Sequence, residues 1–239
     1  MPQLPTQSLE YCSGLLHRQN EDRWLAARYA PEPLRSALIA IGAFTLELHR
    51  IPGAVSEPAL GEIRLQWWRE AFDEIRSGKP PRAHPVVEAL SATGFNSAVY
   101  APQLDGMIDA MTHPLYREGF STIAGLHEWL TQSDGAADAV CVLLAGGDAS
   151  MAQAAAKAGA AFAMAREGAA LAPNLAGEMP EAALRLYKEA APWLANAPPE
   201  VVPALLHLSL TPIYARHAGK PFPICKRLRL FSAMAFANF

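Results

Sequence analysis

The chain has 239 residues, of which 51% are hydrophobic and 18% are charged, so it can bury a core and is not expected to be disordered. Its 20 Lys and Arg residues stand against 23 Asp and Glu residues, a net charge of -3, whereas a general nucleic-acid binder usually carries a basic excess. The three cysteines are too far apart for a disulfide framework or a zinc site. We therefore expect a protein of a reducing, cytoplasmic compartment without a nucleic-acid partner.

Composition and proline positions predict helices from Pro33 onward. Alanine, the best helix former, is frequent, most of all between Met151 and Glu200. Prolines cluster where helices should begin or end, because proline fits the first helical turn but breaks a helix interior. In chain order, the predicted helices are Pro33–Ile51, Glu57–Gly78, Pro85–Ala92, Ala98–Thr112, Thr122–Leu144, Ser150–Leu171, Glu181–Ala195, Pro203–His217 and Ile224–Ala237.

The first two of these helices have the clearest local signals. Between Pro33 and Ile51, apolar residues recur at steps of three and four, which is typical of a helix that buries one face. Ser56 is a suitable N-cap for the second helix, and Gly78 is suited to its end. No stretch alternates convincingly between apolar and polar residues. We predict an all-α fold, with residues 1–239 forming a single domain.

Several segments resemble the squalene and phytoene synthase family in residues, order and spacing. The strongest matches are Pro33–Phe44, Arg64–Glu70 and Gly78–Val86, and weaker ones are Gly106–Asp109, Trp129 with Gly135, and Gly159–Ala161. The resemblance implies an isoprenoid-synthase-type helical bundle with a central cavity, in which a prenyl lipid is a candidate ligand. The residues that it suggests for the cavity wall are Glu47, His49, Arg50, Arg64, Trp67, Asp109 and Trp129.

Glu47, His49 and Arg50 allow two interpretations. A carboxylate beside a histidine and an arginine is a candidate acid/base group in a pocket. Alternatively, Glu47 and Arg50 are three residues apart and form an ordinary ion pair on a helix surface.

Active members of the family condense two prenyl diphosphates head to head, and two aspartate-rich motifs hold the magnesium ions that bind the diphosphates. Hard cations need several carboxylate oxygens. Alignment on Ala43 and Phe44 puts the first motif's aspartates at His49 and Gly53, and the place of the second motif contains Ala169, Ala170 and Asn174. We therefore predict a catalytically degenerate member, with no catalytic residue and no cofactor.

The local detail is similar to one branch of the family, the non-catalytic, phytoene-synthase-like assembly factors of respiratory complex I. The matching segments are Ala43–Leu48, Val55–Glu57, Arg64–Trp68 and Thr131–Ser133. This resemblance implies a binding or assembly factor whose partner is a protein such as a complex I subunit. It also implies a peripheral position on the inner membrane.

Two aspartate pairs keep an enzymatic alternative open. Asp105 with Asp109, and Asp134 with Asp138, each have the four-residue spacing that puts two carboxylates on one helix face. If the two faces met, they would form a relocated magnesium site for a prenyl-diphosphate transferase with non-standard acids. The simpler interpretation, which we prefer, is that these acids are solvated.

The C-terminal segment is both basic and apolar. Lys226, Arg227 and Arg229 precede an apolar run, and no acidic residue lies between Arg216 and Arg229. Such a segment is typical of a helix on an anionic membrane or at a partner surface. A terminal helix packed on the core is an equal alternative, and a helical scaffold without any ligand is a third class of function.

Overall fold

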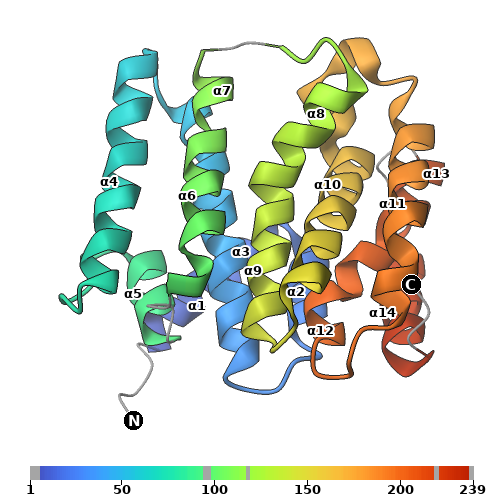
Figure 1. Ribbon diagram of the computed structural model, residues 1–239, viewed down its shortest axis with the longest axis horizontal. Coiled ribbons are helices and arrows are strands. Elements are labelled where there is room, and N and C mark those ends of the chain that lie inside the picture. The colour runs from blue at the N-terminus through green and yellow to red at the C-terminus, as the bar shows by residue number, and fades with distance from the viewer. Residues whose placement is uncertain (1–5, 94–97, 117–118, 218–220, 237–239) are drawn as a thin grey trace. The chain divides into compact units, whose positions relative to one another are not determined.

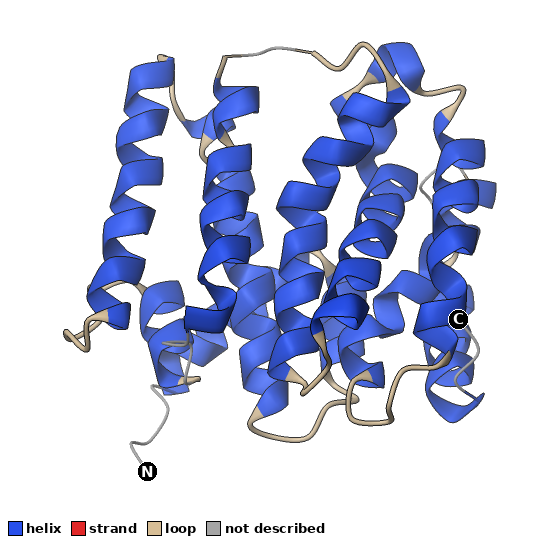
Figure 2. Ribbon diagram, viewed as in Figure 1, coloured by secondary structure: helices blue, strands red, loops and turns tan. Residues whose placement is uncertain are grey.

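The computed structural model describes residues 6–93, 98–116, 119–217 and 221–236. All regular elements in these ranges are helical and none is a strand, so the all-α prediction is confirmed (Figures 1 and 2). The helices group into two compact units, Met1–Glu118 and Gly119–Phe239, and each unit is described by itself. The single-domain organisation stays a prediction.

The first unit is organised around α3, which packs against α1, α2, α5 and α6. Gly42 lets α1 approach α3 closely, because a Cβ there would lie 2.8 Å from Leu16 Cδ1. Phe44 of α3 contacts Trp68 and Phe72 of α4, with ring centroids 5.1 and 5.0 Å apart, so the two best-predicted helices are neighbours. The elements are α1 (Thr6–Gln19), α2 (Glu21–Ala27), α3 (Leu34–Arg50), η1 (Pro52–Ala54), α4 (Pro58–Arg76), α5 (Pro85–Ala92), η2 (Ala98–Tyr100), α6 (Ala101–Ala110) and α7 (Thr112–Leu115).

The second unit is organised around α10, which packs against α8, η3, α9, α11 and α13. Buried residues occur on all sides of α10, as expected of a central helix. Its neighbour η3 is a single π-helical turn. The elements are α8 (Ile123–Leu130), η3 (Thr131–Gly135), α9 (Ala136–Leu144), α10 (Ala149–Leu171), η4 (Pro173–Leu175), α11 (Met179–Ala195), α12 (Val202–Leu205), η5 (Leu206–Leu210), α13 (Thr211–Arg216) and α14 (Pro223–Phe236).

The structure differs from the predicted helices in three places. Helices α1 and α2 were not predicted. The predicted helix Pro203–His217 is interrupted by the 3-10 turn η5, where the hydroxyls of Ser209 and Thr211 donate to carbonyls three residues earlier, each at 2.7 Å. The predicted helix Ala98–Thr112 is divided into η2 and α6. The predicted end at Ala237 lies outside the described residues.

Candidate functional site

A pocket of about 270 Å³ opens at the C-terminal end of α3 in the first unit. Its wall comes from α3, η1, α4 and the residue before α5. Four of the residues suggested for a cavity wall meet here, Glu47, Arg50, Arg64 and Trp67, and they are joined by Ile51, Ala54, Trp68 and His84.

One side of the pocket is aromatic. The ring of Trp68 lies 5.2 Å from that of Trp67 and 5.2 Å from that of His84. His84 is the N-cap of α5, where its Nδ1 accepts a hydrogen bond from the Val86 amide at 3.3 Å. Burial lowers the pKa of His84, so the imidazole is neutral near pH 7 and this side of the pocket carries no charge.

The charged side of the pocket contains more cations than anions. Glu47 accepts hydrogen bonds from Tyr11 at 2.9 Å and from Arg50 at 3.0 Å, so the ion pair predicted from the three-residue spacing is present. The carboxylate is largely buried and Arg50 is exposed. Arg64 makes no ion pair with any described residue. The two positive charges of Arg50 and Arg64 therefore outnumber the one negative charge of Glu47 in the pocket wall.

The charge on Glu47 also affects α1 behind the pocket. Burial, together with the nearby carboxylate, raises the pKa of Tyr11, and it raises the pKa of the buried Cys12 to about 12. Both groups are therefore neutral near pH 7, and Cys12 is not a reactive thiolate.

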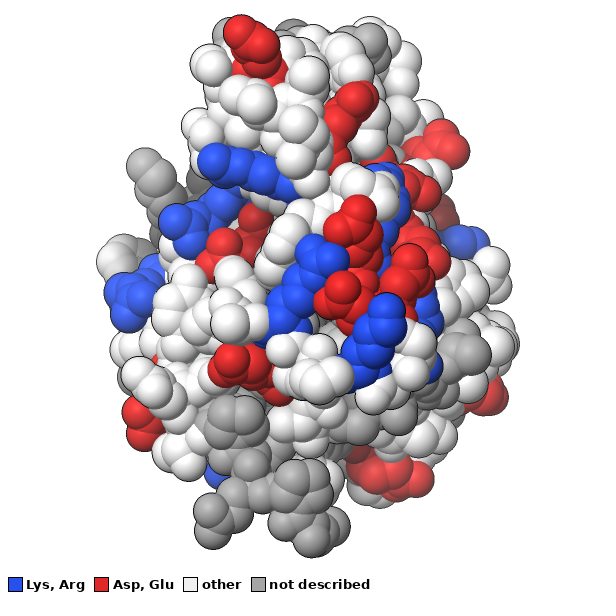
Figure 3. All heavy atoms as spheres, turned by 90° about the vertical axis from the view of Figure 1, so that its left-hand side faces the viewer, with Lys and Arg blue, Asp and Glu red and all other residues white. Residues whose placement is uncertain are grey.

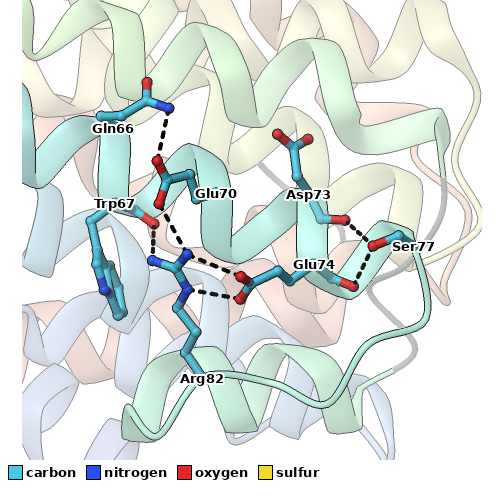
Figure 4. A network of polar contacts seen from close by, with 7 residues as sticks. All are labelled: Gln66, Trp67, Glu70, Asp73, Glu74, Ser77 and Arg82. Carbon is cyan, nitrogen blue, oxygen red and sulfur yellow. Dashed lines mark hydrogen bonds and ion pairs between the residues drawn. The ribbon is translucent and has the colours of Figure 1, made fainter.

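The position of Trp67 depends on Arg82, a residue that the sequence analysis missed. Arg82 donates to Glu74 at 2.7 and 3.0 Å, to Glu70 at 3.0 Å and to the Trp67 carbonyl at 3.4 Å (Figure 4). Its guanidinium also lies 5.3 Å from the Trp67 ring centre. These hydrogen bonds lower the pKa of Glu70 and Glu74. The sequence does contain a signal for this network: Glu70 and Glu74 are four residues apart, and an arginine follows them in the next loop.

Acidic and basic side chains alternate on the face that contains this network (Figure 3). Neither sign accumulates there, so that face does not form a broad anion- or cation-binding surface. The excess of positive charge is local to the pocket. With its aromatic side, the pocket suits an anionic group attached to an apolar or aromatic one.

Three of the suggested cavity residues lie outside this pocket. His49 is on α3 but does not line it. Asp109, on α6, forms an ion pair with Arg69 of α4. Trp129 is in the second unit, buried on α8, with its ring centre 5.3 Å from that of Phe120.

The aspartates suggested for a relocated magnesium site have other partners. Asp105 lies 3.6 Å from Arg76 Nη1. Asp138 is fully buried on α9, and its carboxylate lies 3.1 Å from His207 Nε2 of η5. Asp134 lies in the π-turn η3. Within the described ranges, no group of three or more His, Cys, Asp and Glu residues has an arrangement that could hold a metal ion. The relocated site therefore stays a hypothesis.

The three cations suggested for a membrane or partner surface are on α14, and they differ in exposure. Arg229 Nε donates to the Ser209 carbonyl at 3.1 Å, so this side chain is directed to the interior of its own unit. Arg227 is exposed and Lys226 is partly buried.

A second pocket, of about 360 Å³, lies between α8, α10 and α11 in the second unit. None of the suggested site residues lines it. Its walls include His127, Lys157, Glu189 and Trp193. Burial lowers the pKa of His127, so this pocket also contains a neutral imidazole near pH 7.

Comparison with known proteins gives a family and a fold. Residues 16–167 match the model of the squalene/phytoene synthase family. The structure is similar to the crystal structure of a dehydrosqualene synthase bound to a ligand, with a TM-score of 0.76, 97% of both chains covered and 15% sequence identity. The expected isoprenoid-synthase-type helical fold is therefore confirmed.

Curated relatives belong to one group of proteins. The chain is 34% identical over 82 residues to "NADH dehydrogenase (ubiquinone) complex I, assembly factor 6" of Bos taurus, and 30% identical over 82 residues to that of Homo sapiens; each match covers 34% of this chain and 25% of the relative. It is 25% identical over 129 residues to the Drosophila melanogaster homolog, covering 52% of this chain and 38% of that protein. The chain thus spans about a quarter of the first two relatives.

Proposed function

This chain belongs to the squalene/phytoene synthase family, and we propose that within this family it is a non-catalytic assembly factor of respiratory complex I. It binds a protein partner and does not condense prenyl diphosphates. The observation that carries the proposal is the pocket at the end of α3, which has an aromatic side and two arginines but a single carboxylate.

The chemistry of this pocket supports binding over metal-dependent ionisation. A diphosphate held through magnesium needs several carboxylate oxygens, and the positions that the family resemblance gives to aspartates are His49 and Gly53. At the second motif, Ala169 and Ala170 end α10, and Asn174 donates a hydrogen bond to the Phe120 carbonyl at 3.0 Å. The proposed occupant of the pocket is an acidic side chain of the partner next to an apolar one.

The curated relatives support the same proposal, since their names describe assembly of complex I. We place the protein on the cytoplasmic side of the inner membrane, as a peripheral protein. A prenyl lipid in a central cavity, which the family resemblance implies, is a second proposed ligand.

A deletion strain tests the proposal. Deleting the gene should lower the amount of assembled complex I on native gels and the NADH:quinone oxidoreductase activity of membranes, while prenyl lipids stay unchanged. Wild-type protein should restore both, and Arg64→Glu should not. Arg185→Glu is the matched control, because Arg185 is an exposed arginine on α11 in the other unit. Normal complex I in the deletion strain would refute the proposal.

Prenyl transfer is the alternative function, and family membership favours it. It predicts that the purified protein releases pyrophosphate from farnesyl or geranylgeranyl diphosphate when magnesium is present. We expect no release. If release occurred and Asp105→Ala or Asp134→Ala abolished it in a folded protein, the relocated magnesium site would be correct.

A further inference from the structure

Helix α14 presents an apolar face that its own unit does not cover. Among the described residues, 13 large apolar side chains are exposed, and six of them lie between Phe222 and Phe236. Ile224, Leu228 and Phe231 are 62%, 62% and 61% exposed. Their spacing of four and three residues puts them on one side of the helix. A contiguous exposed apolar face of this kind usually marks an interaction surface.

The opposite side of α14 is held by the second unit. Leu230 and Ala233 are buried, and α14 packs against η5. The hydrogen bond from Arg229 to the Ser209 carbonyl fixes the rotation of the helix about its axis. The exposed face is therefore held outward by contacts on the other side of the helix.

The segment that carries this face contains cations but no acidic residue. After Glu200 the sequence contains no acidic residue, but it contains Arg216, Lys220, Lys226, Arg227 and Arg229. The complete chain has a net charge of -3, so this end has the opposite sign to the chain as a whole. Apolar residues between cations, without acids, are complementary to an anionic lipid surface.

The helix is too short to cross a bilayer. Its 14 residues span about 21 Å, less than the roughly 30 Å hydrocarbon core. Across the described ranges, no helix combines the length and the apolar character needed to span a membrane. A position along the surface, with the apolar side chains between headgroups, is the arrangement that fits.

We propose that α14 binds an anionic membrane surface through Ile224, Leu228 and Phe231, with Lys226 and Arg227 near the lipid headgroups. The inference extends the proposed function, because it identifies the face by which an assembly factor lies on a membrane. It differs from the interpretation based on the basic residues alone, since Arg229 is hydrogen-bonded to the Ser209 carbonyl and the apolar side chains enter the lipid.

Flotation with vesicles tests this surface on the full chain. The protein should float with vesicles of phosphatidylcholine and phosphatidylglycerol, and the variant Ile224→Ser/Leu228→Ser should bind at least about tenfold more weakly. Raising the salt from about 0.1 M to about 1 M should also weaken binding, because the Debye length shortens from about 10 Å to about 3 Å. Leu60→Ser/Ile63→Ser, which changes two exposed residues of α4, is the matched control and should bind like the wild type.

A fluorophore on Cys225 gives a second measurement. Cys225 is exposed, whereas Cys12 and Cys141 are buried, so an environment-sensitive thiol dye labels α14 selectively. Its emission should shift to the blue when anionic vesicles are added. Circular dichroism should show unchanged helix content in both double variants.

Three results would overturn the inference. They are no binding of the wild type to anionic vesicles, equal loss of binding in the two double variants, and dissociation of a dimer in Ile224→Ser/Leu228→Ser with unchanged vesicle binding. The last would make the face a contact between two copies. The vesicle assay contains no complex I, and the deletion strain is measured without vesicles. The membrane-binding proposal and the assembly-factor proposal can therefore fail separately.

Discussion

One helix contact in each unit shows a different way of packing. In the first unit, α3 and α4 meet through the rings of Phe44, Trp68 and Phe72, and the pocket lies beside this contact. In the second unit, η3 approaches α10 through Gly135, where a Cβ would collide with the Ala156 carbonyl oxygen. Large rings hold backbones apart and leave space beside them, whereas glycine allows backbones to touch. The aromatic contact in the first unit therefore leaves space for a ligand, and the glycine contact in the second unit favours a rigid backbone.

Two sets of charged contacts, one in each unit, differ in burial. The ion pairs around Arg82 and Arg69 in the first unit are partly exposed, and exposed pairs contribute little to stability. The second unit buries Asp138 next to His207. Variants of the Asp138 and His207 pair should therefore cost more stability than variants of the ion pairs around Arg82 and Arg69.

The largest expected effect is in the buried pair. His207→Leu leaves the Asp138 carboxylate buried without its imidazole, and it should lower the free energy of unfolding by about 3 to 5 kcal/mol. Urea unfolding measures this. His207→Leu combined with Asp138→Asn should recover part of the loss, because the carboxyl group is no longer buried beside an apolar side chain. A single variant as stable as the wild type would contradict the comparison.

Close backbone contact gives the next effect. Gly135→Ala should cost about 1 to 3 kcal/mol, because the added methyl must push η3 away from the backbone of α10. Gly106→Ala is the control: nothing lies within 4 Å of the added Cβ on α6, so this change should stabilise the protein by about 0.5 to 1 kcal/mol. Thermal unfolding of the two variants should shift in opposite directions.

A pH effect is expected at the pocket. Burial lowers the pKa of His84 in the folded protein from the ordinary value of 6.5, so the unfolded chain takes up this proton more readily. The contribution of His84 to the free energy of unfolding is therefore fully present above pH 6.5, and it is lost as the pH drops below 6.5. His84→Asn, whose side chain can still cap α5, should reduce this fall. Urea unfolding at several pH values checks it.

His127, whose pKa is also lowered by burial, should account for part of the pH dependence that remains in His84→Asn. If His84→Asn left the pH dependence of stability unchanged, the pKa of His84 would be the same in the folded and the unfolded protein, and this prediction would be wrong.

The smallest effect is expected at the exposed network. Arg82→Gln removes the hydrogen bonds that lower the pKa of Glu70 and Glu74, so both values should rise toward the ordinary 4.5. Carboxyl NMR titration measures this rise. The small loss of stability near neutral pH should disappear as the pH falls below 4.5, where the carboxylates are protonated. Arg185→Gln on α11 is the control and should leave both titrations unchanged.

The helices that were predicted best are those with local signals. Proline at the start and a periodic apolar face give the positions of α3, α4 and α5 to within two residues. Helices α1 and α2 have weaker signals: Asp22 and Arg23 are buried in α2, and their polarity hides its packing role. The π-turn η3 lies inside a correctly predicted helical run, because hydrophobic periodicity does not distinguish a π-turn from an α-turn.

The candidate site was predicted in part. Family resemblance indicated Glu47, Arg50, Arg64 and Trp67, which lie within 21 residues of one another. Arg82 was missed, because its role depends on how the loop before α5 folds back onto α4.

Helix positions could be read directly from the order of residues, because propensity, capping and spacing act between neighbours in the chain. The absence of aspartates at the expected motif positions came from the family resemblance. The pairing of Asp138 with His207, the inward direction of Arg229 and the outward face of Ile224 depend on how distant helices pack. Burial decides whether a charged or apolar side chain meets solvent, lipid or an opposite charge, and burial is a property of the packed helices together.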